Sequence, residues 1–153
     1  MISSFLAAPS PGGLPSRSMP EAANVHNLLL ILAKDLASRL ATPGFVVDRE
    51  GTLLYYNEAA ESALGLPYAE TGRMRADEWA KLFEPTRDDG SLVPLDELPT
   101  AIVLTRHEPS HQAFTIRTAE GEHRKVAVTA LPLFAHADEL VGALAVFWED
   151  SGS

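Results

Sequence analysis

Residues Gly44–Ala60 of this 153-residue chain read GFVVDREGTLLYYNEAA and carry its clearest structural signals. Two short runs rich in branched and aromatic side chains, Phe45–Val47 and Thr52–Tyr56, flank the polar turn Asp48–Gly51, and this pattern predicts a β-hairpin. Asn57 follows at once, and Asn is a preferred N-cap because its side-chain oxygen accepts a hydrogen bond from the first turn of a helix. A short helix is therefore expected directly after the hairpin.

Downstream of this helix, the sequence predicts small helices and then strands. Residues Pro67–Phe83 are typical of one or two short helices, and Asp96 is expected to cap a further helix that ends at Arg106. Because the alternating runs that follow are joined by short turns, an antiparallel meander is expected. These runs are Gln112–Thr118, Lys125–Phe134 and Leu140–Trp148.

Upstream of the hairpin, the chain divides into a tail and a helix. Prolines and glycines crowd residues 9–20, which leaves little to bury, so residues 1–20 are expected to form a flexible tail. Leu30 and Ile31 project to other sides of the predicted helix Glu21–Leu40, so this helix is expected to have more than one packing partner. Its main apolar stripe has the spacing i, i+3, i+4, i+7 and consists of Val25, Leu28, Leu29, Leu32, Leu36 and Leu40.

Composition excludes several classes of function. Twelve Lys and Arg against 21 Asp and Glu give a net charge of −9, whereas a nucleic-acid partner requires a basic surface. The sequence has no cysteine, so a thiol nucleophile, a thiolate metal ligand and a flavin–cysteine adduct are excluded. No apolar run approaches the ~20 residues of a membrane span. Since no basic residue precedes the apolar start of the chain, a cytoplasmic location without a membrane partner is expected.

The order of hairpin, capped helix, small helices, connecting helix and three strands resembles the PAS sensor domain over Pro43–Asp150. The resemblance divides the chain into a tail (1–20), a cap and dimerisation helix (21–42), the domain (43–150) and a second tail (151–153). The motifs that carry it are GFVVDxxG at 44–51, YNxAA at 56–60, DGSxxPxxELP at 89–99, TAEGE at 118–122 and LVGALAVF at 140–147.

The resemblance implies an α+β fold, in which small helices cover one face of a five-stranded antiparallel sheet and the N-terminal helix covers the other. The motif at 89–99 is similar to that of a common bacterial subgroup. One departure is WEDS at 148–151, where the last strand of the family often ends in Asp-Ile-Thr. The expectation is therefore either a stand-alone sensor or a sensor whose output domain is missing.

The function implied is that of a signal-sensing and protein-interaction module, with a separate signalling protein or a missing output domain as its downstream partner. The apolar stripe of the leading helix is the expected homodimer interface. A small apolar ligand is a further expected partner, in the cavity that PAS domains have between sheet and small helices. Its candidate lining residues are Phe45, Val47, Trp79, Phe83, Ile102, Val103, Phe114, Ile116, Val126 and Val128.

Three chemistries are weighed against this interpretation. Residues His107–His111 read HEPSH, like a zinc-protease motif, but Pro109 disfavours the helix that such a site requires, so no metal is expected. Haem would use His107 as its axial ligand, and a non-covalent flavin would use Trp79 and Asn57. Neither cofactor is expected, because His107 ends its helix and the other two have simpler roles as core anchor and cap.

Enzyme activity is not expected either. Acid–base chemistry in such a fold needs an Asp or Glu among the inward-facing strand positions, and the sequence places none there. Haem or flavin sensing and a dimerisation module without any ligand stay as alternatives.

Overall fold

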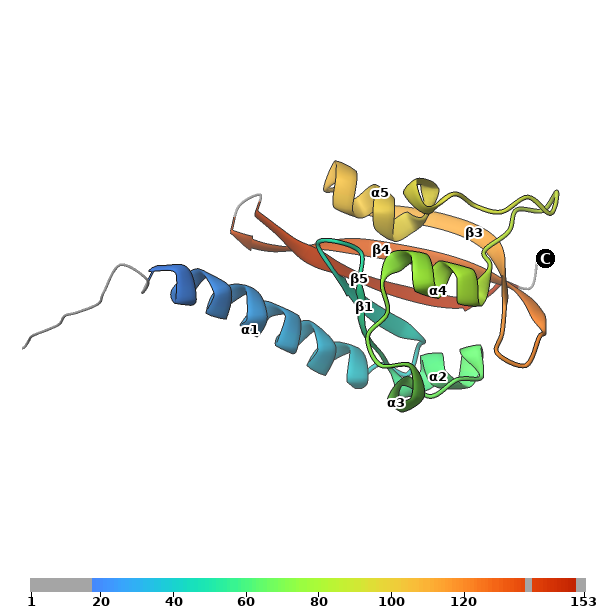
Figure 1. The fold of residues 1–153 in the computed structure, drawn as a ribbon, viewed down its shortest axis with the longest axis horizontal. Coiled ribbons are helices and arrows are strands. Elements are labelled where there is room, and N and C mark those ends of the chain that lie inside the picture. The colour runs from blue at the N-terminus through green and yellow to red at the C-terminus, as the bar shows by residue number, and fades with distance from the viewer. Residues whose placement is uncertain (1–17, 137–138, 151–153) are drawn as a thin grey trace, which may run out of the picture.

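The computed structural model describes residues 18–136 and 139–150, with side chains from residue 25 onward (Figure 1). Of the flexible tail predicted at residues 1–20, residues 1–17 lie outside the described residues, as does the tail at 151–153. Residues 18–20 belong to α1, so the helix begins earlier than the predicted residue 21. The elements of the described structure, in chain order, are α1 (Ser18–Ser38), β1 (Gly44–Asp48), β2 (Leu53–Tyr56), α2 (Glu58–Leu64), α3 (Tyr68–Thr71), α4 (Ala76–Phe83), the 3₁₀ turn η2 (Leu95–Glu97), α5 (Pro99–Arg106), β3 (Ser110–Arg117), β4 (His123–His136) and β5 (Glu139–Glu149).

The five strands form one antiparallel sheet in the order β2-β1-β5-β4-β3, which confirms the predicted sheet and meander. The last strand returns to the middle and pairs with β1, so the opening hairpin and the meander share one sheet. Gly142 makes this pairing feasible, because a Cβ atom at this position would lie 2.2 Å from the carbonyl oxygen of Val47. Only glycine permits so close an approach of the two backbones.

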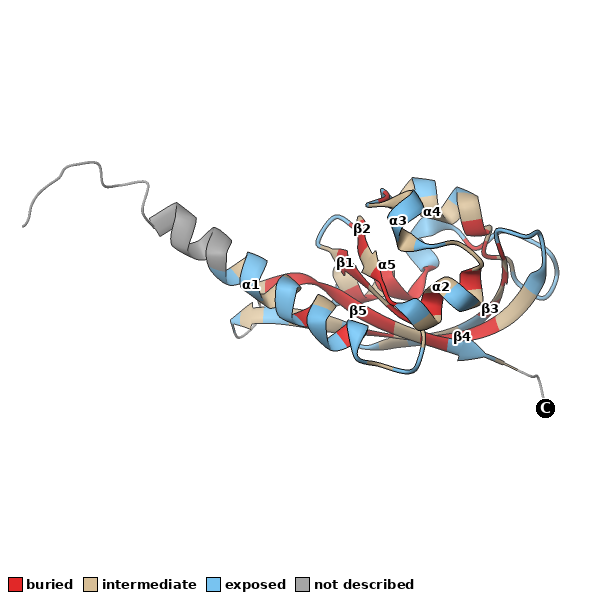
Figure 2. Ribbon diagram, turned by 90° about the horizontal axis from the view of Figure 1, so that it is seen from below, coloured by how far each residue is buried: buried red, intermediate tan, exposed pale blue. Residues whose placement is uncertain are grey.

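The sheet separates two apolar layers (Figure 2). The larger layer lies between the sheet and the small helices and includes Tyr56, Leu98 and Val103. The smaller layer lies between the sheet and α1 and is built on Val46 and Leu144. The predicted α+β fold, with helices on both faces of the sheet, is therefore confirmed.

The predicted helix that starts at a cap on Asp96 is wrong in its start. Residues 95–97 form the separate turn η2, and α5 begins only at Pro99. A residue before proline is pushed toward extended backbone, and Leu98 has φ −70° and ψ 151°. Pro99 therefore divides the two segments and serves as the first residue of α5, where its missing N–H costs nothing.

Within residues 18–136 and 139–150, no helix is long and apolar enough to cross a bilayer.

Candidate functional site

Asn57 positions both layers relative to each other. As the N-cap of α2, its side-chain oxygen accepts hydrogen bonds from the backbone N–H of Ala60 at 2.9 Å and of Gly44 at 3.0 Å. Its amide nitrogen donates to the carbonyls of Ala37 at 2.8 Å and Thr42 at 2.9 Å. All four hydrogen-bonding positions of this buried amide are thus used, and one side chain joins α1, β1 and α2.

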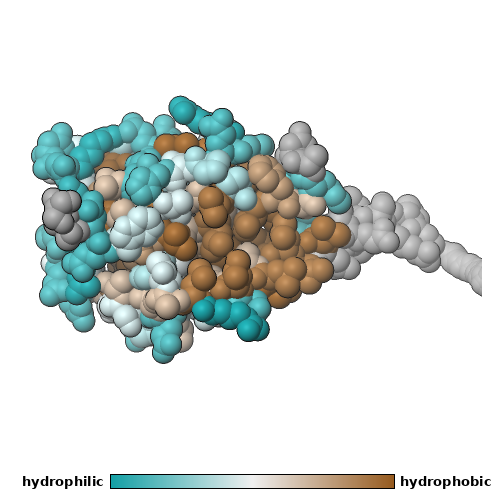
Figure 3. Space-filling view, turned by 180° about the vertical axis from the view of Figure 1, so that it is seen from behind, coloured by the Kyte–Doolittle hydropathy of each residue, from teal (hydrophilic) through white to brown (hydrophobic). Residues whose placement is uncertain are grey.

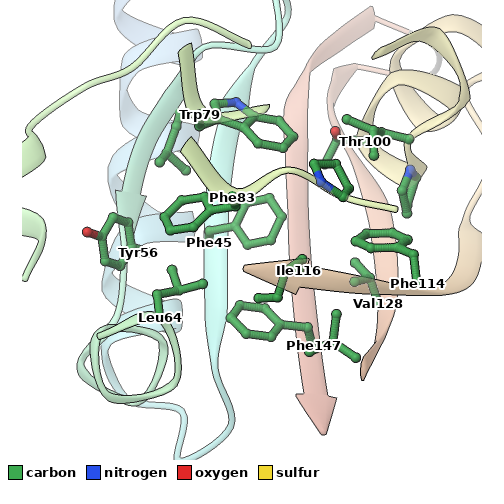
Figure 4. A pocket seen from close by; sticks show the side chains of 15 residues that line it. Phe45, Tyr56, Leu64, Trp79, Phe83, Thr100, Phe114, Ile116, Val128 and Phe147 are labelled. Carbon is green, nitrogen blue, oxygen red and sulfur yellow. The ribbon is translucent and has the colours of Figure 1, made fainter. Parts of the chain in front are cut away.

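A cavity of about 70 Å³ lies between the sheet and the small helices (Figure 4). The ring of Phe45 forms part of its wall, with its centroid 6.3 Å from that of Trp79 and 6.1 Å from that of Phe147. These three rings come from β1, α4 and β5, so the cavity forms only when the sheet and the small helices pack together.

Seven of the ten lining residues proposed from the sequence line this cavity: Phe45, Trp79, Phe83, Phe114, Ile116, Val126 and Val128. Val47 and Val103 are buried in the same core but do not line it. Ile102 lies elsewhere, at a more open and polar pocket beside Arg87 and Gln112. Neighbouring residues on a helix point in different directions, so Ile102 reaches the second pocket while Val103 is fully buried in the core.

Eight further lining residues were not predicted: Leu53, Tyr56, Leu64, Pro85, Leu98, Pro99, Thr100 and Phe147. Alternation along the last strand was the signal that could have found Phe147. No local pattern marks Pro85, which follows α4, or Thr100, because only the path of the chain brings them to the cavity.

Most polar groups of the lining already have partners. The Tyr56 hydroxyl donates to the carbonyl of Leu66 at 2.7 Å, and the Trp79 indole N–H donates to the carbonyl of Gly51 at 3.2 Å. Burial raises the pKa of Tyr56 above its ordinary value, so the phenol stays protonated at neutral pH. The lining as described contains no carboxylate, imidazole, ammonium or guanidinium group.

The residues present do not fit haem or flavin. His107 ends α5 in left-handed backbone, is exposed, and has its ring 6.1 Å from that of Phe134 rather than in the cavity lining. Trp79 and Asn57 use their polar atoms within the protein. The cavity has about half the volume of the ~150 Å³ site that holds a single benzene.

The zinc-type motif does not form a site. His107 ends a helix, whereas His111 lies in β3, with its ring 5.9 Å from that of Trp148. The two imidazoles are therefore not one turn apart on a helix, which the motif requires. Among the described residues, no group of three His, Asp or Glu side chains is arranged to hold a metal ion.

A second candidate site is the outward side of α1. This helix packs on the sheet through Ala33 and Ala37, which are buried, together with Leu30. Small residues let the helix approach the sheet closely, and the leucines beside them stay outside. Of the six interface candidates, Val25, Leu28, Leu32 and Leu36 are 42–56% exposed, and Leu29 is half-buried. The prediction of Leu40 as part of the helix stripe is wrong, because α1 ends at Ser38.

The exposed apolar side of α1 is part of a larger patch. On the neighbouring face of the sheet, Leu131 in β4 is 44% exposed and Trp148 in β5 is 42% exposed. Figure 3 shows brown, apolar surface spread over this side of the molecule, with hydrophilic surface around it. Near the start of the helix, His26 lies against Glu139 of β5, with 3.1 Å between Nε2 and Oε2.

Comparison with known proteins places this architecture in a family. The model of the PAS fold matches residues 34–149. The PAS domain of BvgS from Bordetella pertussis is similar, at 19% identity and a TM-score of 0.54, over 79% of this chain and 84% of that one. A PAS domain from Colwellia psychrerythraea aligns at 13% identity and a TM-score of 0.57, over 82% and 99% of the two chains.

A light-oxygen-voltage (LOV) protein from Rhodobacter sphaeroides is also similar, at 14% identity and a TM-score of 0.58, over 83% of this chain and 69% of that one. At these identities the similarity concerns the fold alone. No curated protein matches the sequence.

Proposed function

This chain belongs to the PAS-fold family, and from that premise we propose that it is a signal-sensing module that forms a homodimer through α1 and takes a small ligand in its cavity. The observation that carries the proposal is the exposed apolar stripe on a helix that is already packed on the sheet. Monomeric proteins rarely leave a large continuous apolar patch exposed.

The spacing of the stripe favours a second copy of the same chain as the occupant. The exposed members Val25, Leu28, Leu32 and Leu36 follow one another at intervals of three, four and four residues. Intervals of three and four keep these side chains on one side of the helix, where an identical helix can pack against them. The same patch on each copy is self-complementary, as a twofold dimer requires.

Signal transfer would run through β1 and β5, because both strands contribute to both layers. In β1, Phe45 lines the cavity while its neighbour Val46 packs under α1. In β5, Phe147 lines the cavity while Leu144 packs under α1. A ligand that moves these strands changes how α1 packs on the sheet, and the populations of the dimer arrangements shift as a result.

The proposal is for a non-catalytic, colourless module. Its support is a cavity lining without an acid–base group, in a volume too small for haem or flavin. An absorption spectrum of the purified protein is expected to show no band in the visible range. A flavin or haem band would overturn this part. The downstream partner is expected to be a protein, since the net charge of −9 disfavours nucleic acid.

Light scattering during size-exclusion chromatography tests the dimer. Leu32 and Ile31 are both 55% exposed on α1, but only Leu32 belongs to the stripe. Leu32→Asp is expected to give a monomer, whereas Ile31→Asp, with the same change in charge, is expected to stay a dimer. A monomeric wild type at high concentration, or equal disruption by both variants, would contradict the proposed interface.

A further inference from the structure

Thr100 is the exception among the polar side chains of the cavity. It is the second residue of α5, is only 4% exposed, and lines the cavity. Within the part of the chain that the structure describes, its hydroxyl has no hydrogen-bond partner. Figure 4 shows this oxygen directed away from its helix, toward the side of the cavity where Trp79 lies.

A buried hydroxyl without a partner is costly, because it has given up its bonds to water and gained none. The rest of the site avoids this cost, since Tyr56 and Trp79 both bond to backbone carbonyls. The other buried threonine, Thr118, also has a partner, because its hydroxyl accepts a hydrogen bond from the backbone N–H of Glu122 at 3.2 Å. Thr100 therefore differs from Thr118, since it is buried without a hydrogen-bond partner in the described structure.

We infer that Thr100 is the polar anchor of the ligand, and that the ligand is a small apolar molecule with a single hydrogen-bonding group such as a carbonyl. The hydroxyl donates to that group, and Phe114, Ile116 and Val128 contact the apolar part. This inference rests on the proposed ligand function and specifies the chemical class of the ligand.

The size of the cavity limits the ligand further. At about 70 Å³, the cavity suits a molecule with fewer heavy atoms than benzene, because a cavity that binds benzene has a volume of ~150 Å³. Carbon atoms form the whole wall that the cavity exposes, so the Thr100 hydroxyl lies behind this wall. The inference therefore requires the ligand to displace neighbouring side chains when it binds. A ligand with several charged groups is excluded, since no lining side chain would compensate the charge.

A pair of probes with nearly the same shape tests the anchor. In 2-butanone a carbonyl oxygen stands where 2-methyl-1-butene has a CH₂ group, so the two differ in hydrogen bonding and hardly in size. Affinities are measured by titration, following the methyl resonances of Ile116, Val126 and Val128 by NMR. Each probe is compared between variants rather than with the other probe, because water solvates the ketone better.

Thr100→Val removes the hydroxyl and keeps the shape, whereas Thr100→Ser keeps the hydroxyl. We expect Thr100→Val to weaken the ketone about fivefold to tenfold without weakening the alkene, and Thr100→Ser to retain the ketone affinity. Val128→Phe should block the binding of both probes by filling the cavity. If the Phe side chain prevents folding, Val128→Leu is used as the cavity-filling variant instead.

The outcomes separate the two proposals. If both probes bind wild type and Thr100→Val affects them equally, the anchor is wrong while the cavity remains a ligand site. If neither probe binds wild type, or if Val128→Phe and Val128→Leu leave binding unchanged, the cavity itself is not the site and the proposed ligand function fails.

Discussion

The side-chain amide of Asn57 donates a hydrogen bond to the carbonyl oxygen of Ala37 at 2.8 Å, which ties the cap of α2 to the last turn of α1. Ala37 is completely buried against the sheet, so the hydrogen bond holds the C-terminal end of α1 on the domain. The cap of a small helix on one face therefore holds the proposed dimer helix on the other. Helix position and domain core are coupled through one side chain.

Asn57→Asp tests this coupling. The substitution keeps the one oxygen that accepts from Gly44 and Ala60, but it replaces the donating NH₂ group by a second carboxylate oxygen. This oxygen faces the carbonyls of Ala37 and Thr42 without a proton to donate. We expect a loss of about 3 kcal/mol in the free energy of unfolding, since a buried charge is left unpaired. Chemical denaturation measures it.

The matched control is Asn27→Asp, the same change at an exposed position of α1. It should alter stability by less than about 0.5 kcal/mol. Equal effects at the two positions would mean that the loss at Asn57 reflects added negative charge, and not the lost bond to α1.

The two buried threonines predict opposite results for the same substitution. Thr100→Val removes a hydroxyl that has no partner in the described structure, so stability should stay constant or rise by up to about 1 kcal/mol. Thr118→Val leaves the N–H of Glu122 without its 3.2 Å acceptor and should cost about 1 kcal/mol. Thermal unfolding measures both. A loss at Thr100 as large as that at Thr118 would indicate that its hydroxyl is satisfied.

Gly142→Ala tests the contact between β1 and β5. The added Cβ would lie 2.2 Å from the carbonyl oxygen of Val47, so the two strands must separate. At Gly44, in the same strand pair, the corresponding distance to the carbonyl oxygen of Ala145 is 3.3 Å, which a small shift relieves. Gly142→Ala should cost several kcal/mol, about 3 or more, and Gly44→Ala clearly less. Similar midpoints in denaturant would contradict this order.

His26→Ala tests how the first half of α1 is held on the sheet. The imidazole contacts Glu139 at 3.1 Å, whereas His136 lies 3.8 Å from the same carboxylate and is 72% exposed in its side chain. Because the pair is partly exposed, its loss should change global stability by less than about 1 kcal/mol. Hydrogen exchange of the α1 amides should nevertheless become about threefold faster. His136→Ala is the control, and an equal acceleration there would argue against the His26 contact.

Several features follow from the sequence because they depend on neighbours in the chain. Branched residues on both sides of Asp48–Gly51 specified the hairpin, Asn57 specified the start of α2, and alternation specified three strands that become a meander. Pro99 was a local signal as well, because the residue before a proline favours extended backbone, and it separates η2 from α5.

Local patterns thus specify the order and type of the elements and the presence of an apolar stripe on α1, since hydrophobic periodicity depends on residues close together in the chain. Which side of α1 is covered depends instead on tertiary packing, because the close approach to the sheet selects Ala33 and Ala37 over the larger leucines. Tertiary packing alone also brings Phe45, Thr100 and Phe147 around one cavity. These residues are far apart in the chain, and their meeting depends on how the strands pair, which no single stretch of sequence encodes.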